Sequence, residues 1–100
     1  MFQKKDVIYS ETLGVCRVDD ITKLVQKKGD VILYYVLRSL ENKEKVAYIP
    51  VENHSVNLRE LIDYKEALEM KPKLTKDDSI LKKFEVEYVI KNRNPEKGQI

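Results

Sequence analysis

The sequence predicts an α+β fold, with an antiparallel sheet in the first part of the chain and helices in the last part. Up to about residue 62, runs of β-branched and aromatic residues of strand length alternate with short polar turns. From residue 63 onward, apolar residues recur at helical spacing behind candidate N-cap residues. Segregation of strands and helices along a chain is typical of this fold class.

The stretch from residue 31 to residue 53 is the centre of the predicted sheet. It begins with seven consecutive apolar residues, Val31 to Leu37, which is the length of a strand. A polar break at residues 41–44 separates this run from a second one, Lys45 to Val51. We interpret the two runs as an antiparallel hairpin. Pro50 has no backbone N–H, so the returning strand must end there or lie at the edge of the sheet.

Two further strands are expected before this hairpin. Val7–Tyr9 forms a short strand candidate, and Gly14 supplies the permissive backbone of the turn that follows. Val15–Val25 has an imperfect alternation, which indicates a long bent strand with a bulge near Asp19 and Asp20. A polar turn centred on Gly29 then leads into the hairpin.

The chain after the hairpin changes its periodicity. Val56–Leu58 is a candidate for a short fifth strand. Asp63 is placed to cap a helix over Tyr64–Met70, which Pro72 would end. The strand order and the terminal helices together suggest a small Tudor/SH3-like antiparallel barrel followed by C-terminal helices.

Thr75 is the candidate N-cap of a second helix, over about Lys76 to Asn92. Its expected apolar face consists of Ile80, Leu81, Phe84, Tyr88 and Val89. An alternative is a strand, because residues 84, 86, 88 and 90 also alternate. We prefer the helix, since the cap, the length and the spacing agree.

Composition restricts the class of protein. Lys and Arg number 19 and Asp and Glu number 17, so the net charge of +2 argues against a strongly basic nucleic-acid binder. The single cysteine, Cys16, permits no intrachain disulfide and favours a reducing, cytoplasmic environment. No apolar run approaches the roughly 20 residues of a membrane span, so no membrane association is expected.

The sequence offers no constellation of catalytic residues. His54 lies in a polar loop, where we expect an ordinary exposed histidine, and Cys16 lies within a strand pattern, where we expect a buried thiol. No glycine-rich phosphate loop and no metal-ligand spacing is present. We therefore expect a binding module that is not an enzyme and that uses no cofactor, metal or small-molecule ligand.

Residues 1–62 resemble the RNA-polymerase-interacting domain of the CarD/CdnL family of bacterial transcription regulators, a domain also found in the transcription-repair coupling factor. The resemblance rests on short pieces that occur in order from the first methionine. They are Met1-Phe2, Val7-Ile8-Tyr9, Leu13-Gly14-Val15, Gly29 before Tyr34-Tyr35-Val36-Leu37-Arg38, Ile49-Pro50-Val51-Glu52-Asn53, and Leu58-Arg59-Glu60-Leu61-Ile62.

The resemblance implies a Tudor-like domain over residues 1–62 that docks on the β subunit of bacterial RNA polymerase. Residues 63–100 would then be a helical segment, corresponding to the start or a shortened form of the family's C-terminal helical domain. In the family this domain contacts promoter DNA, and the complex stabilises the open promoter. This chain has no tryptophan, a residue that the family uses against DNA. Promoter DNA is therefore expected to bind only weakly, or within the polymerase complex.

The predicted edge strand is the expected docking surface, because an open edge offers unpaired backbone groups to a partner strand. The partner-binding candidates are Arg38, Val46, Ala47, Tyr48, Ile49 and Pro50. Tyr48 is the expected anchor, since tyrosine is a common hot-spot residue. The alternative function is a Tudor/SH3-like module that binds nucleic acid directly, with tyrosines stacking on bases.

Overall fold

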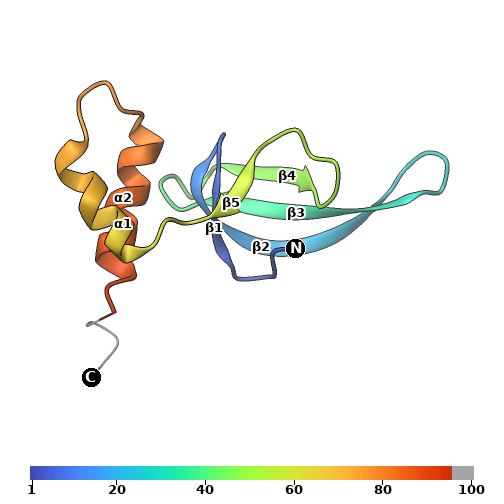
Figure 1. Ribbon diagram of the computed structural model, residues 1–100. Coiled ribbons are helices and arrows are strands. Elements are labelled where there is room, and N and C mark those ends of the chain that lie inside the picture. Colours follow the sequence, from blue (N-terminus) through green and yellow to red (C-terminus); the bar gives the residue numbers. More distant parts are fainter. Residues whose placement is uncertain (96–100) are drawn as a thin grey trace.

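The computed structural model is described for residues 1–95, which form a five-stranded antiparallel sheet and two α-helices (Figure 1). This confirms the predicted α+β class. The strands are β1 (Val7–Ser10), β2 (Gly14–Val25), β3 (Val31–Ser39), β4 (Val46–Pro50) and β5 (Leu58–Glu60). The helices are α1 (Tyr64–Met70), a single 3-10 turn η1 (Lys71–Lys73), and α2 (Ile80–Asn92).

The strands lie in the order β4-β3-β2-β1-β5, so β4 and β5 are the two edges. Within residues 1–95 these edges do not pair with each other. The sheet is therefore open and does not close into the predicted barrel. The placement of β4 at an edge confirms the expectation that was based on Pro50.

The predicted hairpin and bulge are both present. In the β3–β4 ladder, Arg38 lies opposite Val46 and Tyr34 lies opposite Pro50. The β2–β3 ladder shifts register between Val18 and Asp20, which leaves Asp19 as the extra residue of a bulge. Gly14, at the turn before β2, has a φ of +72°, a conformation that glycine adopts without steric cost.

The fifth strand lies two residues later than the predicted Val56–Leu58. It pairs with β1, with Leu58 opposite Ser10 and Glu60 opposite Ile8. The carbonyl of Asn57 accepts a hydrogen bond of 3.1 Å from the Glu11 amide, just beyond the last pair. Pairing with β1 thus decides the strand position, and the apolar pattern around Val56 does not.

The strand register places the core residues of the sheet on one face, which we call the inner face. It consists of the buried residues Ile8, Cys16, Val18, Tyr35, Leu37 and Ile49. Phe2, Val51 and Val56, which lie outside the five strands, pack against this cluster. The Phe2 amide donates a 3.0 Å hydrogen bond to the Tyr35 hydroxyl, which holds the N-terminal segment over the core.

Helix α1 confirms the prediction made from Asp63. The Asp63 carboxylate accepts a 2.7 Å hydrogen bond from the Glu66 amide, which satisfies one of the free N–H groups at the helix start. The helix ends at Met70 and continues as the 3-10 turn that contains Pro72. Ala67 is buried against Val86 and Val89 of α2, which forms a second, helical core.

Helix α2 begins at Ile80, four residues after the predicted start, and its N-cap is Ser79. Thr75 does not cap the helix, because it forms a separate turn with Asp78. The Thr75 amide donates a 2.8 Å hydrogen bond to Asp78 Oδ2, and the Thr75 carbonyl accepts one of 3.2 Å from the Asp78 amide. The helix includes residues 84–90, so the alternative strand is wrong.

The buried face of α2 agrees with the predicted one at Val89 and differs from it elsewhere. Glu85, Val86 and Val89 are its buried residues, whereas Ile80 is 71% exposed. Phe84 and Tyr88 are half-buried and stack on each other, with ring centroids 6.3 Å apart. Glu85 was missed because a search for apolar spacing passes over an acidic residue.

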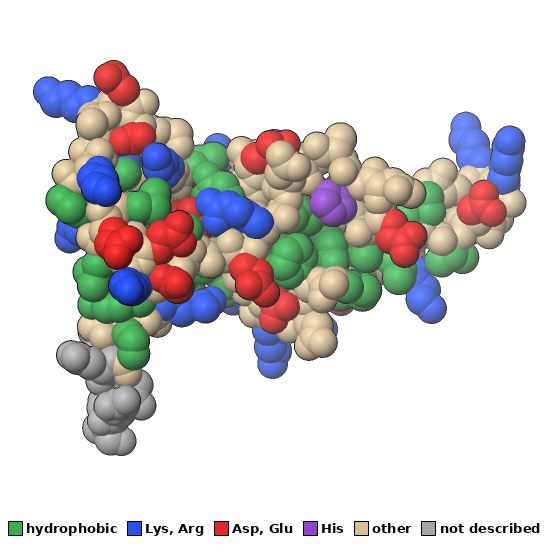
Figure 2. All heavy atoms as spheres, in the orientation of Figure 1, with side chains coloured by type: hydrophobic (Ala, Val, Ile, Leu, Met, Phe, Trp, Pro, Cys, Tyr) green, Lys and Arg blue, Asp and Glu red, His purple; other side chains and the backbone are tan. Residues whose placement is uncertain are grey.

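The last residues of β2 and the first residues of β3 project beyond β4 as a two-stranded β2–β3 hairpin (Figure 1). Hydrophobic side chains line this hairpin and lysines gather at its tip (Figure 2). Its exposed apolar residues are Leu24, Val25, Val31 and Leu33. Among residues 1–95, neither helix has the length and apolar character that a membrane span requires.

Candidate protein-docking surface

The backbone of β4 is open on the side away from β3. The Ser39 amide donates to the Lys45 carbonyl and the Val51 amide donates to the Leu33 carbonyl, so these two pairs bond across the ladder. Because such pairs alternate in an antiparallel ladder, residues 46, 48 and 50 direct their backbone groups outward. The missing N–H of Pro50 would therefore point to the open side. The β3–β4 ladder loses no hydrogen bond because of this proline.

The six predicted docking residues divide between the two faces of the sheet. Val46, Tyr48 and Pro50 lie on the outer face, and Tyr48 is 60% exposed. Ile49 is only 5% exposed and belongs to the core, and Ala47 packs against that core. Ala47 and Ile49 thus support the edge from within, while the other three side chains remain accessible beside the open backbone.

The outer face extends from β4 onto β3. Val36 lies opposite Tyr48, and Tyr34 lies opposite Pro50, so both half-buried β3 side chains flank the edge. The same face continues along the projecting hairpin through Ile32 and Leu24, which pair with each other. The sequence-based list did not contain these residues. For the three β3 residues, Ile32, Tyr34 and Val36, the signal was their even-numbered position in the apolar run, because alternate residues share a face with Arg38.

Arg38, the remaining predicted residue, is part of an ion-paired cluster. Its Nε lies 2.6 Å from Asp19 Oδ2, and Arg17 Nε lies 2.8 Å from Asp19 Oδ1. Hydrogen bonds from Arg38 and then Arg17 hold the pKa of Asp19 below its usual range. Arg38 also donates to the Lys43 carbonyl at 2.6 Å. Two arginines and one aspartate give this part of the outer face a formal charge of +1.

Cys16 lies in β2, and His54 lies in the loop that follows β4. Cys16 is fully buried in the sheet core, as predicted, and burial raises the pKa of its thiol to about 12. His54 is half-buried, in contrast to the exposed histidine that we expected. Its Nδ1 donates a 2.6 Å hydrogen bond to the Val56 carbonyl, which ties the ring to its own loop.

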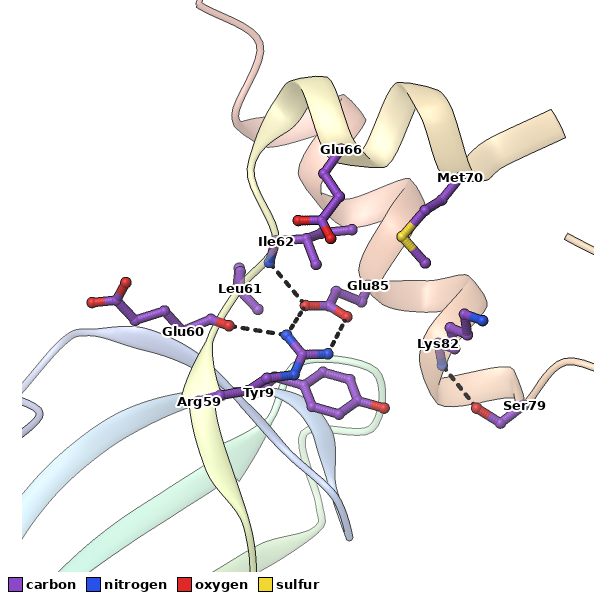
Figure 3. A pocket seen from close by; sticks show the side chains of 10 residues that line it. All are labelled: Tyr9, Arg59, Glu60, Leu61, Ile62, Glu66, Met70, Ser79, Lys82 and Glu85. Carbon is purple, nitrogen blue, oxygen red and sulfur yellow. Dashed lines mark hydrogen bonds and ion pairs between the residues drawn. The ribbon is translucent and has the colours of Figure 1, made fainter. Parts of the chain in front are cut away.

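A cleft of about 560 Å³ lies at the other end of the sheet, between β5 and α2 (Figure 3). At its base, Arg59 of β5 forms a bidentate ion pair with Glu85 of α2. Sequence reasoning did not identify this pair, because the two residues are 26 positions apart and lie in different elements. Among residues 1–95, no group of three His, Cys, Asp or Glu side chains could hold a metal ion.

Comparisons with protein-family models, with curated proteins and with solved structures find no match to this chain.

Proposed function

We propose that this chain is a non-enzymatic transcription regulator that docks on the β subunit of bacterial RNA polymerase through the open edge of β4. Bound there, it modulates the stability of the open promoter complex. The observation that carries the proposal is the outward backbone of residues 46, 48 and 50, with Tyr48 beside it. The polymerase as partner comes from the resemblance of residues 1–62 to the CarD/CdnL interaction domain, which is Tudor-like.

Docking by strand addition follows from the chemistry of the edge. A strand from the partner would accept from the N–H groups of Val46 and Tyr48 and donate to the carbonyls of Val46, Tyr48 and Pro50. Within residues 1–95, no hydrogen bond uses the outward groups of Val46 and Tyr48. Main-chain bonds of this kind give affinity, and the side chains on either face give specificity.

The outer face supplies that specificity. Tyr48, Val36 and Tyr34 form an apolar and aromatic surface next to the open backbone. The Arg17–Asp19–Arg38 cluster borders it with a net positive charge. A complementary partner therefore presents an extended strand whose side chains are apolar, with an acidic group near Arg38.

The positions of the helices are compatible with action on a promoter. Helices α1 and α2 follow β5, and β5 is the edge opposite to β4 (Figure 1). A partner strand added to β4 consequently leaves the helices uncovered. In the proposed complex they are free to contact the DNA that polymerase holds near the docked sheet.

A binding measurement with the purified polymerase β subunit tests the proposal. Tyr48→Ala should lower the affinity at least tenfold, about 1.4 kcal/mol, while the domain remains folded. Leu68→Ala is the matched control, because Leu68 is another large apolar side chain that is exposed, but on α1. The control should bind as the unmodified chain does. Normal binding by a folded Tyr48 variant would count against docking on this surface.

Salt dependence separates this function from direct nucleic-acid binding. Affinity for duplex DNA without polymerase should be weak, in the non-specific range of about 10⁻⁴–10⁻⁶ M, and should fall steeply as salt rises. Binding to the β subunit should depend much less on salt, since backbone hydrogen bonds and apolar contacts dominate. A specific submicromolar complex with DNA alone would favour the alternative.

A further inference from the structure

Glu85 is a buried carboxylate on α2 that accepts hydrogen bonds from Arg59 of β5 and from Ile62, in the segment between β5 and α1. The residue is 1% exposed. Its Oε2 accepts from Arg59 Nη1 at 2.7 Å and from the Ile62 amide at 3.1 Å, and its Oε1 accepts from Arg59 Nη2 at 2.8 Å (Figure 3). One carboxylate thus joins α2 to β5 and to Ile62, in the segment between β5 and α1.

Arg59 is itself held in place on the sheet. Its guanidinium lies over the Tyr9 ring of β1, 4.1 Å from the ring centroid. Its Nη1 also donates to the Glu60 carbonyl at 2.9 Å. Since Arg59 pairs with Tyr9 across the β1–β5 ladder, the guanidinium has a fixed direction relative to the strands. The planar guanidinium donates two parallel hydrogen bonds to the Glu85 carboxylate, and this bidentate geometry restricts the orientation of the carboxylate.

The turn before β2 provides a second contact between sheet and helix. A Cβ at Gly14 would lie 2.9 Å from Cδ2 of Leu81, on the first turn of α2. The helix therefore rests directly on the backbone of this turn. The contact at Gly14 limits how close α2 approaches the sheet, and Leu61 and Ile62 pack against the helical core from the segment between β5 and α1.

We infer that the Arg59–Glu85 contact fixes the orientation of the helical unit, residues 63–92, relative to the sheet. Glu85 is a positioning residue: it touches no partner in the proposed complex and acts through the direction in which it holds the helices. The functional consequence rests on the proposed function, because a docked sheet can place the helices on a promoter only if the two parts keep one relative orientation. The orientation itself does not depend on that proposal.

Orientation, and not stability alone, is the property that this chemistry supplies. Glu85 is buried, whereas the Arg59 side chain is 49% exposed. Even a fully buried ion pair is often no more stabilising than a well-packed apolar pair of the same volume. The Arg59–Glu85 ion pair requires a more specific geometry, because the two Glu85 oxygens must align with three donors, the two Arg59 Nη atoms and the Ile62 amide. The helical unit has its own apolar core around Ala67, Val86 and Val89, which holds α1 and α2 together without Arg59.

Distance measurements between spin labels test the inference on the free protein. Labels at Lys45→Cys beside β4 and at Glu69→Cys on α1 report the sheet-to-helix distance, and both positions are exposed. The unmodified pair should give one narrow distribution. Glu85→Gln and, from the other side, Arg59→Met should each widen it at least twofold. Glu87→Gln is the matched control, an exposed glutamate on the same helix, and should leave the distribution unchanged.

Circular dichroism of the same variants completes the test. The helices should remain formed in both Glu85→Gln and Arg59→Met. An unchanged narrow distribution in both variants would overturn the inference. Loss of helix in both would also overturn it, because the contact would then be needed to form α2 and not to orient it.

A second measurement connects orientation to the proposed function. Glu85→Gln should bind the polymerase β subunit within twofold of the unmodified chain, yet its effect on the lifetime of open promoter complexes should fall at least fivefold. If the unmodified chain does not bind the β subunit, the proposed function fails while the distance measurement still decides the orientation. If the variant keeps its full effect on lifetime although the distances widen, the functional part of the inference is wrong.

Discussion

Tyr48 on β4 lies directly opposite Val36 on β3, and the two side chains share the outer face of the sheet at its open edge. Because this pair does not exchange hydrogen bonds across the ladder, the backbone groups of Tyr48 point away from β3. Tyr48 thus combines a large, exposed aromatic side chain with unpaired backbone groups. This coincidence makes the β4 edge the best candidate for docking.

The N-cap of α2 can be tested by two parallel substitutions. Ser79→Ala should lower stability by about 0.5–2 kcal/mol, because the Lys82 amide loses its 3.1 Å hydrogen bond to Ser79 Oγ. Thr75→Ala removes only contacts within the preceding turn, so it should leave the helix start unchanged. Chemical shifts and urea unfolding measure both effects. An equal or larger loss of helix from Thr75→Ala would show that the cap is at Thr75.

The pKa of Asp19 predicts how the outer face responds to acid. The carboxylate form is stabilised by Arg38 and Arg17, so this stability is present above the ordinary aspartate pKa of about 3.9 and is lost as the pH falls through the lowered pKa. Asp19→Asn should cost about 1 kcal/mol at pH 7, since the pairs are partly exposed. The difference from the unmodified chain should shrink below about pH 4. A difference that stays constant from pH 7 to pH 3 would contradict the assignment.

Cys16 should be protected from alkylation in the folded protein. It is fully buried, and its thiol pKa of about 12 leaves almost no thiolate at pH 8. Labelling in native buffer should be at least about a hundredfold slower than labelling in denaturant, because the raised pKa leaves far less thiolate. Comparable rates in the two conditions would mean that β2 opens readily or that the thiol is accessible.

His54 should stabilise its loop without contributing to docking. His54→Ala removes the 2.6 Å hydrogen bond to the Val56 carbonyl and should lower stability by about 0.5–1.5 kcal/mol. Affinity for the β subunit should stay within twofold. A tenfold loss of affinity in a folded variant would place the 51–57 loop in the docking surface.

Local signals allowed much of the fold to be predicted from the sequence. Residues within a few positions of one another indicated the hairpin, the bulge at Asp19 and the cap at Asp63, and Pro50 indicated that β4 lies at an edge. The start of α2 could not be predicted correctly, because Thr75, Asp78 and Ser79 are all good cap residues and the Thr75–Asp78 turn competes for the first of them.

The candidate site was predictable along one strand and not between elements. Pro50 and Tyr48 indicated the edge, since strand alternation is a local property. The openness of the sheet depends on whether β5 meets β4, and the Arg59–Glu85 pair depends on how the helices lie on the sheet. Both are long-range outcomes that no local pattern encodes. The half-buried His54 was missed because its partner is a backbone carbonyl, which sequence does not distinguish.

The outward N–H of Val46 provides the most direct test of docking through the β4 edge. Val46→Pro removes this donor on the open side, where the ladder loses no hydrogen bond, whereas Val46→Ala shortens the side chain and keeps the donor. With both variants shown to be folded by chemical shifts, affinity for the polymerase β subunit is measured by titration. We predict that Val46→Pro binds at least tenfold more weakly than Val46→Ala. Equal affinities for the two folded variants would contradict strand addition at β4.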